Sequence, residues 1–443
     1  PDMVNLVQLN DAQLRTIENK VPGGAGNIQD IYPLTPMQEG FLLHSLMSTG
    51  GDTYVLSWCL SAQTRMRLDA LLNAVQEIIN RHDIFRAAAL WEDLPRPLLV
   101  VYRQAKLQID EFTLTPGSDP VEQLKARIKT STVNLQRAPL IQAEIAPDCN
   151  TRKWYVILKI HHMVDDYRTL EMFVSELMAH LADKAGTLEA PVPYRNVAAR
   201  ILSYVDSGQG EQYFRRKLKG ITEPTLPFNI SDVHLDNSVT EHCRRALEPE
   251  LCARILDYAK QNRVLPATIF HTAWAMVAAH CSGRDDVVFG TVLLGRMQGT
   301  EGGDRAMGMF LNTLPLRLSL RELDVKSAIQ NTHMELTELI QHEMAPLPLA
   351  QRCSEMPADA PLFNSIYNFR HNTAVEEQMQ NNKEVPKSFG IRVIKVNERT
   401  NYPLAISTDQ VADAFYLDVL VDARIGAERV TNYLHCALQN LLD

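Results

Sequence analysis

The sequence predicts an α/β protein with more than one lobe. Strand-like and helix-like segments alternate along both halves of the chain, as expected where strands pack against helices. Residues 154–160, WYVILKI, are rich in β-branched and aromatic residues and are apolar on both faces except for Lys159, which is typical of an inner strand. A length of 443 residues favours two or three lobes over a single core.

Local patterns predict the elements in chain order. Residues 31–48 are predicted as a loop that leads into a helix, with Thr35 as its cap and Pro36 at its first position. Apolar side chains at helical spacing predict helices at 68–82 and, directly after the inner strand, from Leu170 to Leu181. Further predicted strands are 54–60, 97–102, 287–294, 362–369 and 415–422, and further predicted helices are 267–281, 325–343 and one at the end of the chain.

The division into lobes is predicted from a break in these patterns. Residues 183–196 contain Gly and Pro and interrupt the helical spacing, so we expect a linker there. The predicted lobes are residues 1–182 and residues 197–443.

Composition and charge argue against several classes of protein. The net charge of −9 disfavours a nucleic-acid binder, and no run of 18 apolar residues predicts a membrane span. The N-terminus lacks a basic region followed by an apolar core, so no secretory signal is expected, and its lack of Met suggests an excised piece. The seven scattered cysteines form no C-x-x-C pair, which disfavours disulfides and zinc and predicts a reducing, cytoplasmic setting.

Two adjacent histidines, His161 and His162, follow the predicted inner strand. Because side chains alternate along a strand, only one ring can face a given cavity, and the pair cannot easily share one metal ion. A histidine titrates near neutral pH, so one at a strand end is a candidate to accept a proton from an attacking amine.

Two aspartates lie in the turn before the next helix. Asp166 is a candidate to orient the ring of His162 or to hold the turn closed through an arginine, and the dipole of the helix would favour a neutral His162. A structural alternative stays open, because Asp165 or Asp166 can simply cap the helix and most histidines at strand ends are not catalytic. The sequence shows no G-x-S-x-G motif and no reactive-looking cysteine beside the histidines.

The segment HHMVDDY, residues 161–167, resembles the H-H-x-x-x-D-G motif of condensation domains from nonribosomal peptide synthetases. Other segments resemble motifs of that family in the same order. They are DIYPLTPMQEGFLLHSL (30–46), RHDIFRA (81–87), EQYFRRKLKG (211–220), DDVVFGTVLLGR (285–296), MGMFLNTLPLR (307–317) and PLFNSIYNFR (361–370). The resemblance covers residues 30 to about 440.

The resemblance implies a fold and a set of partners. It implies two lobes like chloramphenicol acetyltransferase, forming a V-shaped pseudo-dimer with a central tunnel and the histidine motif midway along it. Peptidyl carrier domains would dock at either end and insert phosphopantetheine arms. No metal or soluble cofactor would be bound by this chain, because the phosphopantetheine belongs to the carrier domain.

The resemblance also implies roles for single residues. His162 matches the histidine with the catalytic role and His161 the first histidine. Asp166 matches the motif aspartate, which is mostly structural and pairs with an arginine.

Three residues in the second half are looser matches. Arg296 is the best match for the arginine that pairs with the motif aspartate, and Arg317 is the second. Asn368 resembles an asparagine that faces the tunnel. A solvated charge or a strand-end cap is an equal alternative for all three.

The chain departs from the motif at Tyr167, where the family has Gly. A Gly permits close approach of backbone and substrate arm, whereas a Tyr fills that space and would narrow the tunnel. In this it is similar to fungal terminal condensation domains, which release a peptide by cyclisation and often carry a bulky residue here. They also often replace the first histidine with Ser, whereas this chain keeps His161, so the match is partial.

The expected activity is amide formation by acyl transfer from a carrier-bound peptidyl thioester to an amine, by intramolecular cyclisation and release. The carrier domain is expected upstream in the same megasynthase, and the excised domain is expected to be monomeric. The alternatives are an ordinary chain-elongating condensation domain and a non-catalytic carrier-docking module. No glutamate motif of an epimerisation domain and no D-F-G-W-G of a plant-type acyltransferase is found. The basic run RRKLK (215–219) is a candidate carrier-docking surface or, more simply, an exposed helix face.

Overall fold

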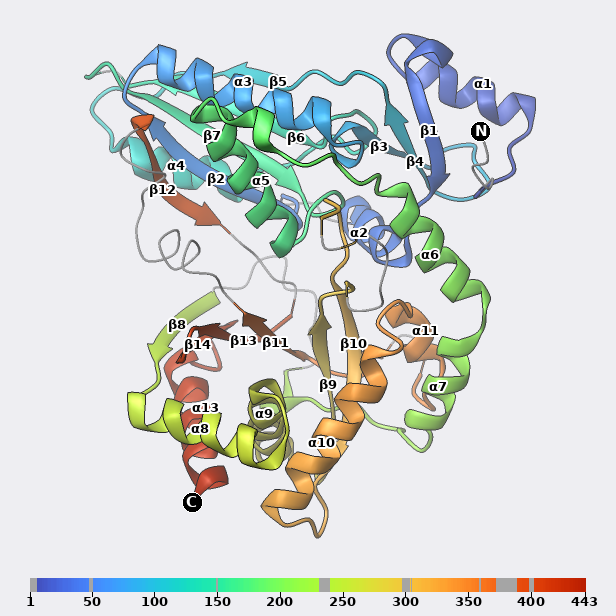
Figure 1. Cartoon of the computed structure of the whole chain (residues 1–443), viewed down its shortest axis with the longest axis vertical. Coiled ribbons are helices and arrows are strands. Elements are labelled where there is room, and N and C mark those ends of the chain that lie inside the picture. Colours follow the sequence, from blue (N-terminus) through green and yellow to red (C-terminus); the bar gives the residue numbers. More distant parts are fainter. Residues whose placement is uncertain are drawn as a thin grey trace. The chain divides into compact units, whose positions relative to one another are not determined.

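The computed structural model describes residues 6–47, 51–148, 150–230, 240–296, 303, 305–357, 360–371, 389–397 and 402–443. Strands and helices follow one another along the described chain (Figure 1), which confirms the predicted α/β class. The chain divides into two compact units. Unit 1 extends to Leu202 and also holds the segment that ends at Phe310 and the segment with β12 (Ile391–Asn397), and unit 2 holds the rest.

This division differs from the predicted lobe boundaries in three ways, the first being that the segment ending at Phe310 belongs to unit 1. The predicted linker, residues 183–196, already contains the first residues of helix α6 (Arg195–Asp206), and unit 1 continues into that helix. Strand β12 joins unit 1 because it pairs with β2 (Val55–Ala62), a contact between segments more than 300 positions apart that local patterns cannot reveal. The V-shaped arrangement and the tunnel stay predictions.

The sheet that carries the histidine motif has five strands in the order β12-β2-β7-β6-β5. Its middle strand, β7 (Trp154–His161), is antiparallel to both β2 and β6 (Ile141–Pro147). Val156, Leu158 and Ile160 join the main core of unit 1. The residues between them, Tyr155 and Ile157, pack in a smaller cluster with apolar residues of α4 (Pro120–Lys129). Apolar layers on both sides explain the apolar faces of β7, and the predicted inner strand is confirmed.

The helices predicted beside this strand are also present. α5 (Tyr167–Leu181) buries Phe173, Val174 and Leu177, and it packs against α3 (Arg65–Arg81). The remaining elements of unit 1 are α1 (Asp11–Lys20), η1 (Gly24–Asn27), β1 (Ile28–Pro33), α2 (Pro36–Met47), η2 (Ile84–Arg86), β3 (Ala87–Leu90), β4 (Leu98–Tyr102), β5 (Gln108–Glu111) and η3 (Ala185–Thr187).

One prediction in this unit was wrong. Residues 31–33 were expected in a loop, but they lie in β1, which is the edge strand of a three-stranded sheet in the order β1-β4-β3. Pro33 is tolerated because it is the last residue of this edge strand. The start of the following helix at Pro36 was predicted correctly.

Unit 2 contains a six-stranded sheet in the order β10-β9-β11-β13-β14-β8. Helices α8, α9 and α13 pack together and cover one face of this sheet (Figure 1). The elements of this unit, besides the end of α6, are α7 (Gln209–Lys217), η4 (Pro227–Asn229), β8 (Thr240–Ala246), α8 (Pro249–Asn262), α9 (Pro266–Ser282), β9 (Asp286–Leu293), β10 (Asn312–Ser319), α10 (Val325–Ile340), α11 (Leu347–Arg352), β11 (Ser365–His371), β13 (Leu404–Val411), β14 (Ala414–Asp422) and α13 (Ala427–Leu442). The predicted helices and strands of the second half are confirmed to within a few residues.

Within the described residues, no single helix has the length and apolar character needed to cross a membrane. The consecutive helices α8 and α9 pass that test only as a pair, with a bend of 109° between them.

Candidate active site

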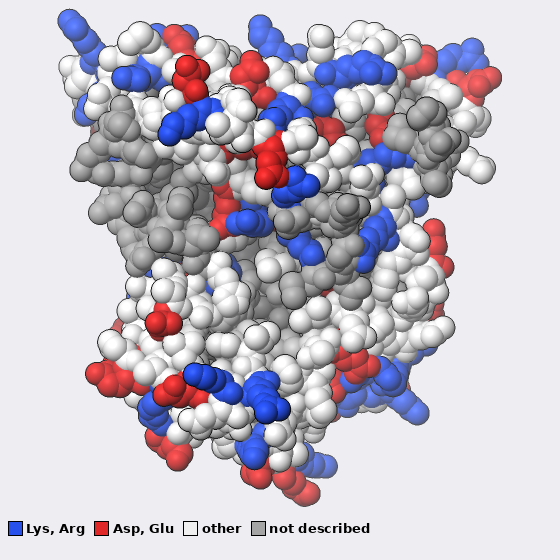
Figure 2. Space-filling view, viewed as in Figure 1, with Lys and Arg blue, Asp and Glu red and all other residues white. Residues whose placement is uncertain are grey.

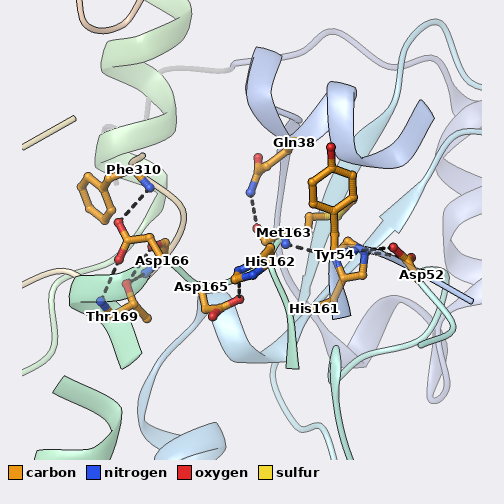
Figure 3. Close-up of polar contacts among 11 residues, drawn as sticks. Gln38, Asp52, Tyr54, His161, His162, Met163, Asp165, Asp166, Thr169 and Phe310 are labelled. Atoms are coloured by element: carbon orange, nitrogen blue, oxygen red, sulfur yellow. Dashed lines mark hydrogen bonds and ion pairs between the residues drawn. The ribbon is translucent and has the colours of Figure 1, made fainter. Parts of the chain in front are cut away.

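The histidine motif lies in the short turn between β7 and α5, and backbone-directed hydrogen bonds hold this turn (Figure 3). The Gln38 side chain, from α2, donates to the carbonyl of Met163 at 2.9 Å. The backbone N–H of His162 donates to the carbonyl of Tyr54 at 2.8 Å. The opening motif around Gln38 and the chain just before β2 therefore fix the turn from two sides.

His161 is a completely buried ring with a defined tautomer. Its Nδ1 accepts a hydrogen bond from the Met163 N–H at 3.0 Å, so the ring proton of a neutral His161 must be on Nε2. Nε2 lies 3.2 Å from Oδ2 of Asp52 and 3.2 Å from Oγ of Ser45. With 0% of its side chain exposed, His161 is a support for the turn and is closed to a substrate.

The surroundings of Asp52 keep its carboxyl group ionised beside His161. Burial alone raises the pKa of its carboxyl group, but the hydrogen bonds from His161, Ser45 and the Tyr54 N–H outweigh burial and hold the pKa below its ordinary value. Ser45 donates to the same carboxylate at 2.6 Å. The charge that stabilises His161 is therefore present throughout the neutral pH range.

His162 has different surroundings, because β7 ends at His161 and His162 is the first residue of the turn. Its side chain is 21% exposed. Its Nδ1 lies 3.3 Å from Oδ1 of Asp165, whose side chain is fully buried. This histidine therefore combines partial access from outside with a carboxylate behind the ring, which is an arrangement suited to proton transfer.

Asp166 has a structural position. Its carboxylate accepts hydrogen bonds from the backbone N–H of Thr169 at 2.7 Å, which caps α5, and from the backbone N–H of Phe310 at 3.2 Å. The Thr169 hydroxyl donates to the carbonyl of Gly308 at 2.7 Å and accepts from the Gly308 N–H at 3.0 Å. The first turn of α5 thus holds the segment that ends at Phe310.

The two aspartates therefore divide the expected roles. Asp166 was a candidate to orient the ring of His162, but Asp165 is the carboxylate that contacts that ring, and Asp166 is the cap. In Figure 3 the Asp165 side chain lies beside His162 and the Asp166 side chain lies beside Thr169 and Phe310. Burial raises the pKa of Asp165 and the neighbouring Asp166 raises it further, whereas His162 and His161 lower it, with a net increase.

The structure places the other candidate residues as follows. Tyr167 is the first residue of α5 and is half-buried. Its φ is not positive, so the Tyr is accommodated without backbone strain. Arg317 pairs with Asp286 through Nη2 at 2.6 Å and donates to the carbonyls of Lys217 and Lys219, so it is not available to Asp166.

Two further candidates lie on unit 2. Asn368 lies half-buried in β11, where it is opposite Ser407 of β13, and its role stays a prediction. Arg296 follows β9 and is half-buried, and its pairing with Asp166 also stays a prediction.

The basic run at 215–219 is largely neutralised by acidic neighbours. In and beside α7, Arg215 pairs with Glu211 at 2.6 Å, Lys217 pairs with Glu335 at 2.6 Å, and Arg216 pairs with Glu338. These pairs argue against this helix as a docking surface for an acidic carrier. On the face drawn in Figure 2, Lys and Arg side chains of the described residues are interspersed with Asp and Glu side chains.

Sequence patterns missed the residues from elsewhere in the chain that hold the histidine turn. Ser45 and Asp52 contact His161, Gln38 contacts the carbonyl of Met163, and Asp165 is the partner of His162. Gln38 and Ser45 both lie within the quoted opening motif, residues 30–46, so that motif was the available signal. Among the described residues, no group of three or more His, Cys, Asp or Glu side chains is arranged to hold a metal ion.

Comparison with protein-family models gives a match over almost the whole chain. The model described as Condensation domain matches residues 28–425. Malpibaldin synthetase of Mortierella alpina is 38% identical over 446 residues, covering 100% of this chain and 8% of that protein. Gramicidin S synthase 2 of Brevibacillus brevis is 26% identical over 391 residues, covering 86% of this chain and 9% of that protein. The chain thus spans less than a tenth of the length of these curated relatives.

Solved structures give the same fold at lower identity. The condensation domain from the Monacolin K polyketide synthase is 17% identical with a TM-score of 0.69, covering 94% of this chain and 97% of that chain. A four-domain nonribosomal peptide synthetase bound to AMP and glycine is 11% identical with a TM-score of 0.75, covering 94% of this chain and 33% of that chain. The first condensation domain of the CDA synthetase is 16% identical with a TM-score of 0.68, covering 94% of this chain and 96% of that chain. These matches confirm the predicted chloramphenicol-acetyltransferase-like fold.

Proposed function

This chain belongs to the condensation-domain family of nonribosomal peptide synthetases, and we propose that it cyclises and releases a peptide. In this proposal, a peptidyl group passes from a carrier-bound thioester to an amine of the same peptide. The observation that carries the proposal is His162, a partly exposed ring at the end of an inner strand with a buried carboxylate at its Nδ1. The family supplies the reaction type, amide formation by acyl transfer.

The steps assigned to His162 are proton transfers. The amine nitrogen attacks the thioester carbonyl carbon, a C–N bond forms, and Nε2 of His162 accepts the proton that the nitrogen loses. The C–S bond then breaks, and the sulfur leaves with a proton returned by the imidazolium. A positioned base of this kind contributes roughly a hundred- to ten-thousand-fold in rate.

The substrate lowers the demand on the protein. A thioester is already activated, and an amine on the same peptide needs no second binding event, so positioning supplies much of the remaining rate. Asp166 and His161 would contribute only by holding the turn, since both are engaged with backbone groups.

Tyr167 supports cyclisation over elongation. Its bulk occupies a position where most of the family has Gly, and its helical backbone accepts that bulk without strain. We infer that it narrows the path for a second substrate arm, which a cyclising domain does not need. The second candidate function is chain elongation between two carrier-bound substrates, and the retained His161 is the observation that favours it.

The proposed partner is a peptidyl carrier domain of the same synthetase, which delivers the peptide on its phosphopantetheine arm. The arm is part of the substrate, and this chain is proposed to bind no cofactor of its own.

The experiment that tests the proposal supplies a synthetic peptidyl thioester on its carrier, without a second carrier, and determines the product mass. Cyclisation gives release with loss of the carrier thiol and a product one water lighter than the free peptide acid. Release of the free acid means hydrolysis, and turnover only after a second, aminoacyl-loaded carrier is added means elongation. Either of these two results contradicts the proposal.

A further inference from the structure

We propose that Asp165 is a positioning residue for His162, which holds the ring in the tautomer with its proton on Nδ1 and makes Nε2 the proton acceptor. This inference rests on the proposed function, because it assigns a helper to the base. The aspartate that the motif requires is the neighbouring Asp166, so Asp165 occupies one of the motif's variable positions.

The Asp165 carboxylate lies next to Nδ1 of His162, which is where a positioning residue for this ring must be. Oδ1 of Asp165 lies 3.3 Å from Nδ1 of His162. Both carboxylate oxygens are buried, and neither has a well-aligned hydrogen bond within the part of the chain that the structure describes. Nδ1 of His162 is thus a donor position within reach of this carboxylate, and the contact of 3.3 Å is long enough to shorten when the ring becomes charged.

A structural role does not account for Asp165. Capping of α5 and the contact with the Phe310 N–H are performed by Asp166. A buried carboxylate without an aligned donor destabilises a fold unless it is protonated or paired. A chain selected only for stability would place an apolar or amide side chain here, so the observed residue points to a role in function.

The tautomer follows from which group holds the proton. When Asp165 is ionised, it accepts from Nδ1–H, and the lone pair on Nε2 is directed to the opposite side of the ring. When imidazolium forms during the reaction, the negative charge beside it stabilises the proton just acquired. If Asp165 were replaced by Asn, the charge beside the imidazolium would be lost, and the tautomer would no longer be fixed, because an amide can either accept from Nδ1–H or donate to Nδ1.

Other titratable groups surround this pair and must be considered in any pH profile. They are His161 from β7, Asp166 from the same turn, Asp52 and Tyr54 from the chain before β2, and His44 from α2, whose ring lies 5.7 Å from that of Tyr54. Of these, His161 and Asp166 act directly on the Asp165 carboxylate.

The stability effect of removing the carboxylate has a definite sign. The pKa of Asp165 is raised in the fold, mainly by burial, so the folded protein binds its proton more tightly than the unfolded chain does. The carboxyl group therefore favours folding at low pH and destabilises the fold progressively as pH rises through the raised pKa. Asp165→Asn should leave the melting temperature at pH 8 equal to or higher than that of the wild type.

The test combines activity, stability and the state of the ring in one variant. For Asp165→Asn we expect a ten- to hundredfold lower rate of amide formation from a synthetic peptidyl carrier thioester. We expect the pH–rate midpoint and the NMR titration midpoint of the His162 ring, in histidine-¹⁵N-labelled protein, to move to lower pH. Asp165→Ala is the second variant if the amide misfolds, with the same expected shifts.

Asp52→Asn is the matched control, because it makes the same chemical change beside the other histidine. It should lower the melting temperature, because the amide keeps one acceptor oxygen where the carboxylate uses two, one for the Tyr54 N–H and one for His161 and Ser45, and it should leave the titration midpoint of His162 in place. If Asp165 had only a structural role, Asp165→Asn would lower the melting temperature and leave the titration midpoint of His162 unchanged, as expected for Asp52→Asn.

The inference is overturned if Asp165→Asn lowers the melting temperature and leaves both midpoints of His162 unchanged. Its failure can be told from failure of the proposed function. If His162→Ala abolishes turnover while Asp165→Asn leaves both midpoints of His162 unchanged, His162 is the base and Asp165 is not its positioning residue. If His162→Ala retains turnover, the proposed base fails, and the NMR midpoint alone then decides whether Asp165 acts on the ring.

Discussion

Replacing Asp166 with Ala should destabilise unit 1 by about 2–4 kcal/mol. The carboxylate is the acceptor for two backbone N–H groups, those of Thr169 and Phe310, and only 1% of the residue is exposed. Loss of the helix cap costs about 1 kcal/mol, and leaving the buried Phe310 N–H without an acceptor costs about 1–3 kcal/mol more.

The assay is urea denaturation followed by tryptophan fluorescence. Three of the four tryptophans, Trp58, Trp91 and Trp154, lie in unit 1, so the signal mainly reports this unit. Asp166→Asn keeps one acceptor oxygen and should lose less than Asp166→Ala. The matched control is Asp119→Ala, which removes an exposed cap of α4 with a single 3.0 Å bond to Val121 and should cost about 1 kcal/mol. A loss for Asp166→Ala of about 0.5 kcal/mol or less would refute the reasoning, because two buried donors cannot lose their acceptor so cheaply.

Two further predictions concern other parts of the fold. Gly308→Ala should destabilise the protein by about 3 kcal/mol or more in the same urea assay, because φ is +144° there and an added Cβ would overlap the Tyr194 ring. The control is Gly26→Ala, which has open space around it and should change the free energy of unfolding by about 0.5 kcal/mol or less. Equal effects of the two substitutions would contradict the argument. Burial alone raises the pKa of Asp418, but its contacts with His242 and two arginines outweigh burial and lower the pKa to about 2 from 3.8. Its stabilising contribution, about 2 kcal/mol, is therefore present above pH 4 and lost as pH falls towards 2. Melting temperatures of Asp418→Asn should fall less steeply than those of wild type over that interval, and parallel curves would count against the assignment.

The strand and helix that flank the histidine motif were predictable because their signals are local. The apolar run of β7 and the helical spacing of α5 depend on neighbouring residues only. Alternation predicted that the two rings face different surroundings, but it did not say which ring is closed, and β7 ends at His161, so the 21% exposure of the His162 side chain depends on the turn that follows the strand. Strand β12 was not predictable, since its partner β2 is distant in sequence.

The partners of the histidines were beyond local patterns for the same reason. Asp52 reaches His161 across more than a hundred positions, and only the folded sheet brings them together. The turn shows a subtler limit. Spacing identified Asp165 and Asp166 as a pair but could not decide which carboxylate caps the helix and which contacts the ring, because that choice depends on the backbone path between β7 and α5. For Arg317 the motif match suggested a partner that the fold does not provide. Its guanidinium is already paired with Asp286 of the neighbouring strand β9.

The most direct test of the central claim is the single-turnover rate of amide formation by His162→Ala, measured with a peptidyl thioester on its carrier and with the unfolding midpoint recorded for the same protein. We expect a rate at least about a hundredfold below wild type with the fold retained. A rate within about threefold of wild type, in a folded variant, would contradict the assignment of His162 as the base.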